Sequence, residues 1–191
     1  FRPISNLNNI SKIIERLFLA RLQPHILCCP NFNQLQSAYR PHHSTETALL
    51  LSLNNIYEAA DNSQPTLLVS LDLSAAFDTI DHSLLLSRLH TSFGISGTAL
   101  SWLTSYLSNR SQLVRIGQSS SPSALLDSGV PQGSVLGPIL FSVYISPIGT
   151  IFSAFGIHHQ QYADDTQLYI ALSAVNPMPG ISTLESCLTS L

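Results

Sequence analysis

The sequence predicts an α+β fold, because helical and strand-like segments follow one another without a regular βα alternation. Capped or amphipathic segments indicate several helices, and a short apolar run after Pro65 indicates a buried strand. Two further strand-like runs flank residues 162–165 in the pattern of a hairpin. The chain has 191 residues, 45% of them hydrophobic and 10% charged, which is enough for a sizeable core.

Apolar periodicity and capping residues predict the first two helices. Residues 10–24 form an amphipathic segment that Pro24 is expected to end. Its apolar face is Ile10, Ile13, Ile14, Leu17 and Phe18, opposite Lys12, Glu15 and Arg16. Ser44 is a suitable N-cap for a second helix. The apolar stripe expected for that helix is Ala48, Leu49, Leu53, Ile56 and Tyr57.

The central segments combine one strand with two capped helices. Residues 67–73 form an apolar run with a single charge, typical of a strand buried on both faces, so Asp72 is out of place there. Asp81 and Ser96 can each cap a following helix. Short strands are expected at residues 113–116 and 124–126.

Residues 129–133 are predicted to form a loop, after which Ser134 begins an uncharged helix. No charged residue occurs between Asp127 and Asp164, and residues 135–157 are long enough to cross a bilayer. Pro138, Pro147 and several polar residues interrupt this stretch, which favours a buried helix followed by a turn. No membrane segment is therefore expected.

Charge and cysteine content limit the classes of function. The formal net charge is −3 at pH 7, which argues weakly against a complete nucleic-acid-binding protein. Basic residues concentrate in residues 1–45, where Glu15 is the only carboxylate. The three cysteines do not have the spacing of a zinc site or a redox dithiol, which suggests a reducing compartment. The adjacent histidines at 42–43 and at 158–159 have no further ligand at metal-binding spacing. No secretory signal is recognised, and both ends have the character of a fragment.

Asp72, Asp164 and Asp165 are the candidate metal ligands. Adjacent carboxylates at a hairpin apex repel each other unless a cation compensates, and hard oxygen ligands suit Mg²⁺. If the strand before Asp72 neighbours the hairpin, the three carboxylates can hold two divalent ions for phosphoryl chemistry. The alternatives are an ion-pairing role for Asp72 and a solvated turn at Asp164 and Asp165.

Several motifs, in the expected order, resemble the reverse transcriptases of non-LTR, LINE-type retrotransposons over nearly the whole chain. The two fingers blocks are Phe1–Ser5 with Ser11–Glu15, and Gln36–Pro41 with Ser44–Ala48. The segments that resemble polymerase motifs A, B and C are Leu71–Asp78, Gly129–Pro138 and Tyr162–Asp165, respectively. A further family-like segment is Tyr106–Arg110. So many ordered blocks are not expected by chance.

This resemblance implies a right-hand polymerase fold with fingers and a ferredoxin-like palm, whose sheet carries the Tyr162–Asp165 hairpin. Residues 1–65 would belong to the fingers, and residues 66–191 to the palm with a fingers-side insertion near residues 86–128. The chain is expected to stop before motif D and the thumb. An endonuclease-like region and the thumb are expected elsewhere in the full polyprotein.

The implied activity is RNA-directed DNA polymerisation, in which dNTPs extend a DNA primer on an RNA template. Asp72, Asp164 and Asp165 would be catalytic and hold two Mg²⁺ ions, with Mn²⁺ as a substitute. Phe77, Gln132, Gly133 and Arg2 would contact the nucleotide, with Phe77 beneath the sugar, and Arg40 would contact the template. A core role for Phe77 and a solvated role for Arg40 remain open.

Two other readings compete with an active polymerase. One is a catalytically silent retroelement remnant that binds nucleic acid or has no function, and the truncated fragment alone is expected to be inactive or weak. The other, less favoured, is membrane association through residues 135–157. The expected location is intracellular, in the nucleus or cytoplasm.

Overall fold

The computed structural model describes residues 5–191, so Arg2 lies outside the described residues. The chain forms two compact units, one combining the chain up to Asn31 with Ala75–Tyr144 and the other combining Phe32–Ser74 with Ile145–Leu191. We call the first the helical unit and the second the sheet unit. The predicted boundary near residue 65 falls inside the sheet unit, and the assignment of fingers and palm to residue ranges stays a prediction.

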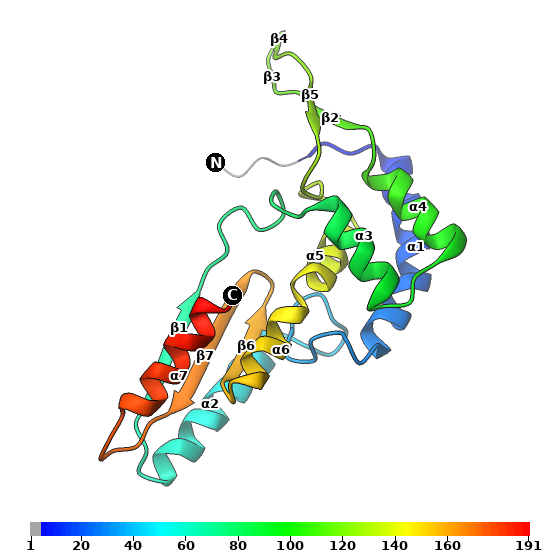
Figure 1. Ribbon diagram of the computed structural model, residues 1–191. Helices are drawn as coiled ribbons and strands as arrows, with labels where there is room; N and C mark the ends of the chain where they lie inside the picture. Colours follow the sequence, from blue (N-terminus) through cyan, green and yellow to red (C-terminus); the bar gives the residue numbers. More distant parts are fainter. Residues whose placement is uncertain (1–4) are drawn as a thin grey trace. The chain divides into compact units, whose positions relative to one another are not determined.

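The helical unit contains four helices and a thin β-arm within its described residues (Figure 1). Its helices are α1 (Asn9–Cys28), α3 (His82–Thr91), α4 (Gly97–Leu107) and α5 (Gly137–Ile145, whose last residue lies in the sheet unit). In the arm, β2 (Arg110–Gln112) pairs antiparallel with β5 (Ala124–Leu126), and β3 (Arg115–Ile116) pairs with β4 (Ser119–Ser120). The predicted strand at residues 124–126 is confirmed, whereas residues 113–116 are only partly strand.

Leucines of α3 and α4 form part of the core of the helical unit. Leu85, Leu89 and Leu103 are completely buried, and Asp81 caps α3 by accepting a hydrogen bond from the Leu84 N–H at 2.7 Å. Ser96 occupies the N-cap position of α4, as predicted, although its side chain makes no capping hydrogen bond. Burial of these leucines therefore stabilises both helices, and capping by Asp81 adds to the stability of α3.

The predicted burial of α1 is wrong. Ile10, Ile13 and Leu17 are 66%, 57% and 58% exposed, whereas Glu15 is 1% exposed. Glu15 Oε2 accepts hydrogen bonds from the backbone N–H groups of Val135 (2.8 Å) and Leu136 (3.1 Å). A buried carboxylate that accepts charge-assisted hydrogen bonds at a helix N-terminus offsets its desolvation. The hydrogen bonds of Glu15 thus decide which face of α1 is buried, and apolar periodicity does not reveal such bonds.

Helix α1 also continues past Pro24, where the sequence predicts its end. Proline removes one backbone donor from the helix interior, but residues beyond it are held by other contacts. Ile26 is completely buried, and His25 Nε2 lies 2.7 Å from the Phe93 carbonyl oxygen. These tertiary contacts of the last turn offset the local cost of proline.

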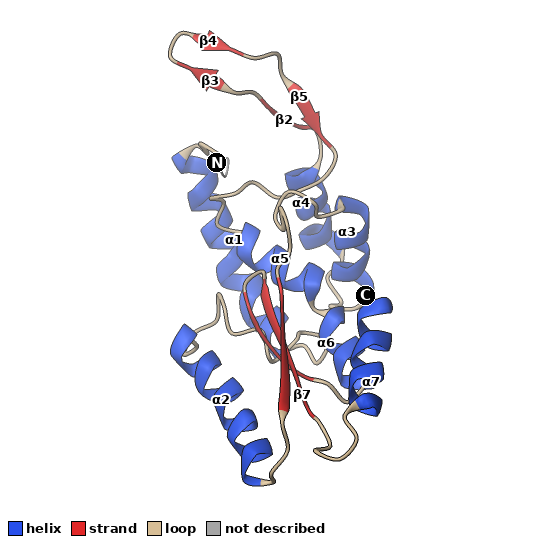
Figure 2. Ribbon diagram, turned by 90° about the vertical axis from the view of Figure 1, so that its left-hand side faces the viewer, coloured by secondary structure: helices blue, strands red, loops and turns tan. Residues whose placement is uncertain are grey.

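The sheet unit has an antiparallel sheet in the order β1–β7–β6, with β1 at Thr66–Leu71, β7 at Asp165–Ala171 and β6 at His158–Tyr162. Helix α2 (Thr45–Asp61) lies on one side of the sheet, while α6 (Pro147–Ala154) and α7 (Met178–Thr189) lie on the other (Figure 2). The succession of β1, a connection that contains α3–α6 and the short strands β2–β5, then β6, β7 and α7 follows the ferredoxin-like order expected of a palm.

Strand β1 is an edge strand, not a strand buried on both faces as predicted. Leu67, Val69 and Leu71 pack on a core formed by β7, α6 and α7, whereas Leu68 is 49% exposed. Asp72 lies one residue beyond the strand and is exposed, so it is not a charge inside a buried strand. An apolar run alone cannot distinguish a central strand from an edge strand.

Helix α2 begins as predicted, with a reciprocal capping box between Ser44 and Thr47. Its predicted apolar stripe is only partly correct, because Ala48 is buried while Leu49 and Tyr57 are 55% and 62% exposed. Ser52, which the apolar pattern omits, is buried and donates to the Ala48 carbonyl at 3.3 Å. Small residues set the buried side of this helix because they permit close packing.

One stretch of the described chain, Gly137–Ala154, has the length and hydropathy of a membrane span, at 18 residues and a mean hydropathy of 1.4. Half of it is buried within the protein, and Ser146 and Pro147 separate α5 from α6. This agrees with the predicted buried helix followed by a break. A stretch of this kind is weak evidence for a membrane span, since soluble core helices share its properties.

Candidate active site

The pairing of β1 with β7 brings three carboxylates to one end of the sheet. The last pair of this ladder is Leu71 with Thr166, so the next positions along the two strands are Asp72 and Asp165. Tyr162 pairs with Asp165 across the β6–β7 hairpin, which leaves Ala163 and Asp164 as its turn. The predicted neighbourhood of Asp72 with the hairpin apex therefore follows from the register.

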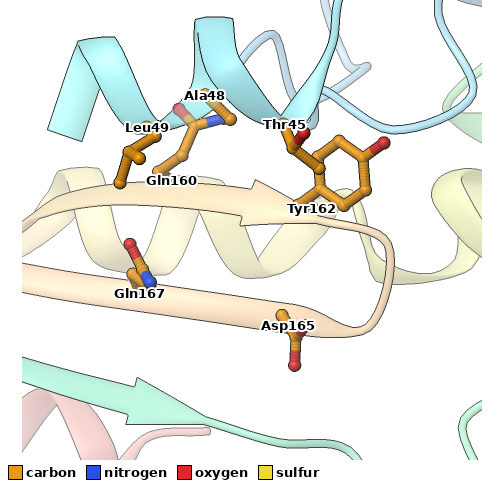
Figure 3. Close-up of a pocket in the computed structure, with 7 residues that line it drawn as sticks. All are labelled: Thr45, Ala48, Leu49, Gln160, Tyr162, Asp165 and Gln167. Atoms are coloured by element: carbon orange, nitrogen blue, oxygen red, sulfur yellow. The ribbon is translucent and has the colours of Figure 1, made fainter.

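Alternation along the strands assigns Asp165 to the face on which α2 lies. A cavity of about 270 Å³ on this face is lined by residues of α2, β6 and β7 (Figure 3). Its lining residues are Thr45, Ala48, Leu49, Gln160, Tyr162, Asp165 and Gln167. In Figure 3 the Asp165 carboxylate points away from α2, toward the strand that carries Asp72 at its end.

The donor set at this end consists of carboxylate oxygens, which suit hard divalent cations. Asp72 and Asp165 are exposed and Asp164 is half-buried. Within residues 5–191, no group of three or more His, Cys, Asp or Glu side chains is arranged closely enough to hold a metal ion. Register thus places Asp72, Asp164 and Asp165 at one sheet end, and their role as metal ligands stays a prediction.

The Asp164 carboxylate at the apex of the hairpin interacts electrostatically with the segment before α2. Burial raises the pKa of the Tyr39 hydroxyl, and the Asp164 carboxylate adds to that rise. Tyr39 itself has a positive φ of 62°. The turn around Tyr39 thus lies near the apical carboxylate, although the two are 125 positions apart in the sequence.

The predicted nucleotide loop, residues 129–133, is held in the helical unit by the end of motif A and the residues that follow it. Backbone N–H groups of Gly129 and Val130 donate to the carbonyl oxygens of Ile80 (2.7 Å) and Phe77 (2.8 Å). His82 Nε2 lies 2.6 Å from the Gly129 oxygen, so this nitrogen carries the proton and donates. His82 therefore helps to hold the loop through this hydrogen bond.

Only glycine fits at position 129. Its φ is +83°, and a Cβ at this position would lie 2.9 Å from the Asp78 carbonyl oxygen. Gly133 also has a positive φ, of 95°, and Ser134 Oγ caps α5 by accepting from the Gly137 N–H at 3.0 Å. Glycine geometry therefore fixes how closely the loop approaches the backbone of motif A.

Gln132 faces a cavity of about 360 Å³ inside the helical unit, which Asp78 and Arg110 also line. The Gln132 carbonyl oxygen accepts a hydrogen bond from the Ser5 N–H at 2.9 Å. Arg110 stacks its guanidinium over the Tyr106 ring at 5.1 Å. A cavity that combines an amide, a guanidinium and backbone groups is suited to a polar, charged ligand. Sequence reasoning did not assign Arg110 to a site.

Phe77 is half-buried, and its ring stacks on Phe141 of α5 with centroids 5.1 Å apart. Packing therefore accounts for part of its role, and contact with a sugar stays a prediction.

Arg40 already has hydrogen-bond partners within the protein, because its guanidinium donates to the carbonyl oxygens of Gln34 (2.7 Å) and Gln36 (3.2 Å). It lies over the Phe32 ring at 5.5 Å, so contact with a template would compete with these bonds.

Two residues with structural roles were missed by sequence reasoning. Periodicity places Glu15 on the polar face of its helix, but it binds the start of α5. The sequence marks Gln36 only as part of a motif, but its side chain contacts the apex of the carboxylate hairpin. Neither has a local signal, since both partners lie more than 100 positions away in the sequence.

A family model described as "Reverse transcriptase (RNA-dependent DNA polymerase)" matches residues 1–190. This chain belongs to the reverse transcriptase family. The resemblance drawn from the ordered motifs is thereby confirmed. Because the match covers nearly the whole chain, both the helical unit and the sheet unit are parts of a reverse transcriptase domain.

Relatives of this reverse transcriptase chain include proteins from mobile elements of Drosophila melanogaster. A probable RNA-directed DNA polymerase from transposon BS is 34% identical over 78% of the chain, and the chain covers 16% of that protein. The RNA-directed DNA polymerase from mobile element jockey is 33% identical over 87% of the chain, which covers 18% of it. The relatives are thus several times longer than this chain.

Solved structures with a similar fold include telomerases. The telomerase of Candida albicans, in complex with a fragment of telomeric RNA, superposes with a TM-score of 0.60 over 95% of this chain and 32% of that one, at 13% identity. Apo telomerase from Candida tropicalis gives a TM-score of 0.59 over 94% of this chain and 33% of its own. These likenesses confirm the polymerase fold expected for the reverse transcriptase.

Proposed function

We propose that the protein carrying this chain is an RNA-directed DNA polymerase of a retrotransposon, which extends a DNA primer on an RNA template with dNTPs. One observation supports this most strongly: the β1–β7 register puts Asp72 beside the hairpin that carries Asp164 and Asp165. Three carboxylates at one sheet end, one after β1 and two at the β6–β7 hairpin, suit divalent cations and phosphoryl transfer. Family membership supplies the reaction class.

Members of this family depend on divalent cations, and we propose Mg²⁺ as the ion, with Mn²⁺ as a substitute. Asp72 and Asp164 would be the main ligands, and Asp165 would support them. Two bound ions would stabilise both the attacking and the leaving oxygen of the displacement. The chain itself would hold these negatively charged carboxylates close together at one end of the sheet, and a bound cation would lower the repulsion between them.

The nucleotide is proposed to contact Gln132, Gly133, Phe77 and Arg2, and the template to contact Arg40. The cavity beside Gln132, with Arg110 on its wall, supports a polar and phosphate-bearing ligand in the helical unit. Gly133 lets backbone approach a ligand closely because it carries no side chain. Arg2 enters this proposal from its motif alone.

The proposed setting is intracellular, in the nucleus or cytoplasm, without a membrane. The three cysteines are free, and only Cys187 among them is a buried core thiol, so a reducing compartment suits the chain. Thumb and endonuclease-like regions are proposed to lie elsewhere in the full protein. Such regions would supply the basic surface that a chain of net charge −3 needs for a nucleic-acid duplex.

The decisive experiment is primer extension on an RNA template with dNTPs and Mg²⁺, by the protein at its full natural length. We expect synthesis by the parent and loss of synthesis in Asp164→Asn, with an unchanged thermal midpoint, because the side chain is half-buried at a turn. Glu185→Gln, an exposed carboxylate on α7, is the matched control and should retain activity. Persistent synthesis in Asp164→Asn would refute the assignment of this carboxylate.

The same assay separates the alternative, a catalytically silent remnant. If the folded parent binds an RNA–DNA duplex but makes no product with either Mg²⁺ or Mn²⁺, the remnant interpretation holds. Motif C and the Gln132–Gly133 loop are intact in the sequence, which favours the active form.

A further inference from the structure

The turn of the carboxylate hairpin has an unfavourable residue at its first position. Ala163 has a positive φ of 57°, and Asp164, the other turn residue, does not. Two-residue hairpin turns with positive φ at the first central position usually carry glycine there. The Cβ of alanine makes a positive φ unfavourable, so other contacts must hold this turn in place.

The side chain of Gln36 supplies those contacts. Its Nε2 donates to the Ala163 carbonyl oxygen at 3.0 Å, and its Oε1 accepts from the Ala163 N–H at 2.9 Å. One amide therefore satisfies both backbone polar groups of the residue that precedes Asp164. Gln36 is 0% exposed, so water does not compete for these hydrogen bonds.

The position of Gln36 is itself fixed by the sheet. Gln36 forms a parallel bridge with Gln161 of β6, flanked by hydrogen bonds from the Ser37 N–H to the Gln161 oxygen (2.9 Å) and from the Gln161 N–H to the Leu35 oxygen (3.0 Å). The same Oε1 also accepts from the Ala38 N–H at 3.1 Å. Residues 35–37 thus extend the sheet beside β6 and hold the amide rigidly against the apex.

Resting on the proposed function, we propose that Gln36 is a positioning residue for the catalytic hairpin. Its amide locks both peptide groups of Ala163 and thereby sets the direction in which Asp164 presents its carboxylate to a divalent cation. The proposal requires an amide at position 36. Leucine has a similar size but leaves both Ala163 groups unpaired, and glutamate cannot donate and adds a buried negative charge near Asp164.

The test compares Gln36→Leu with Asn55→Leu. Asn55 lies on α2 and donates to the Tyr169 hydroxyl at 2.9 Å, so its substitution also removes an amide hydrogen bond to the sheet. Tyr169 pairs with Leu68 and His158, away from the hairpin turn. A loss of general stability affects both variants, whereas a loss of hairpin positioning affects Gln36→Leu alone.

Primer extension by the full-length protein is measured against Mg²⁺ concentration and dNTP concentration, together with thermal midpoints. For Gln36→Leu we expect a roughly tenfold or larger rise in the Mg²⁺ concentration for half-maximal activity and a similar fall in kcat, as is typical of residues that orient metal ligands. The KM for dNTP should change little. Asn55→Leu should keep the parent Mg²⁺ requirement; equal shifts in both variants would overturn the proposal.

A second readout does not need activity. Ions that bind only the folded protein raise its thermal midpoint. We expect Mn²⁺ alone to raise the midpoint of the parent and of Asn55→Leu, and to raise it much less in Gln36→Leu and Asp164→Asn. An inactive parent that still shows this pattern contradicts the proposed function but supports Gln36. A full Mn²⁺ response in Gln36→Leu, or none in the parent, overturns the role of Gln36.

Discussion

At the scale of single residues, Phe77 has both a packing contact with Phe141 and a proposed contact with the sugar of the nucleotide. Its ring stacks on Phe141, so Phe77→Ala should lower stability as well as alter any sugar contact. In the full-length protein we expect this variant to use ribonucleotides, relative to deoxynucleotides, roughly tenfold or more efficiently, because the proposed steric barrier to the 2′-hydroxyl would be lost. The ratio of kcat/KM for rNTP and dNTP measures this effect.

Phe141→Leu is the control for Phe77→Ala. It removes the stacking partner from the same aromatic pair but leaves the Phe77 ring in the chain. The control should lower the thermal midpoint and keep sugar selectivity. If Phe77→Ala and Phe141→Leu have the same selectivity as the parent, Phe77 is a core residue and no more.

His159 makes the stability of the chain depend on pH. Burial lowers the pKa of His159 from 6.5 to about 4, and its neutral ring packs on Phe152 with centroids 5.0 Å apart. As the pH falls from 6.5 toward 4, the unfolded chain binds a proton at this residue while the folded chain does not. By linkage, the stabilising contribution present above pH 6.5 is lost across this window.

We therefore expect His159→Phe to reduce the fall in thermal midpoint between pH 6.5 and pH 4, because phenylalanine keeps the packing without a titrating group. His158→Phe is the matched control, since His158 is exposed and stacks on Tyr169 at 5.6 Å. Thermal unfolding across this pH range measures both. An identical pH profile in the parent and in His159→Phe would contradict a buried neutral imidazole.

At the scale of elements, Glu15 connects α1 with the start of α5. Besides the two backbone N–H groups, Ser11 Oγ donates to its Oε1 at 3.1 Å and the Tyr106 hydroxyl lies 3.4 Å from its Oε2. Burial raises the pKa of Tyr106 to about 12, and the Glu15 carboxylate adds to the rise, so this hydroxyl stays protonated and can donate. Gly133 and Ser134 directly precede Val135 in sequence, so Glu15 also holds the end of the predicted nucleotide loop.

Glu15→Ala should destabilise the protein by roughly 2–4 kcal/mol, because it leaves buried N–H groups of α5 without an acceptor. Glu15→Gln keeps one acceptor oxygen and should cost less. Arg16→Ala, at the exposed neighbouring position on α1, should change stability by about 0.5 kcal/mol or less. Denaturant unfolding measures all three, and equal losses for positions 15 and 16 would show that the carboxylate contributes nothing to stability.

Element prediction succeeded where the signal is local. Ser44 and Asp81 cap their helices as expected, because a capping hydrogen bond involves residues within one turn. The hairpin around Ala163 and Asp164 was also predicted, from two strand-like runs on either side of a tight turn. Prediction failed for α1 and β1, where burial depends on partners distant in the chain.

At the scale of the whole molecule, the two compact units interleave along the sequence. The chain leaves the helical unit after Asn31, returns at Ala75 and leaves again after Tyr144. A linear reading divides the chain into consecutive ranges, so it cannot anticipate units assembled from alternating segments. Motif A itself spans the change of unit, since Asp72 belongs to the sheet unit and Phe77 to the helical unit.

The sequence alone determined the family and the hairpin and predicted the three candidate carboxylates, because these depend on residue types in a fixed order. The tertiary structure decided three other features: the edge position of β1, the burial of Glu15 and the amide contact of Gln36 with Ala163. Each involves hydrogen bonds or packing between segments far apart in the chain. Periodicity and capping report only on neighbours, so these contacts leave no trace in a single sequence.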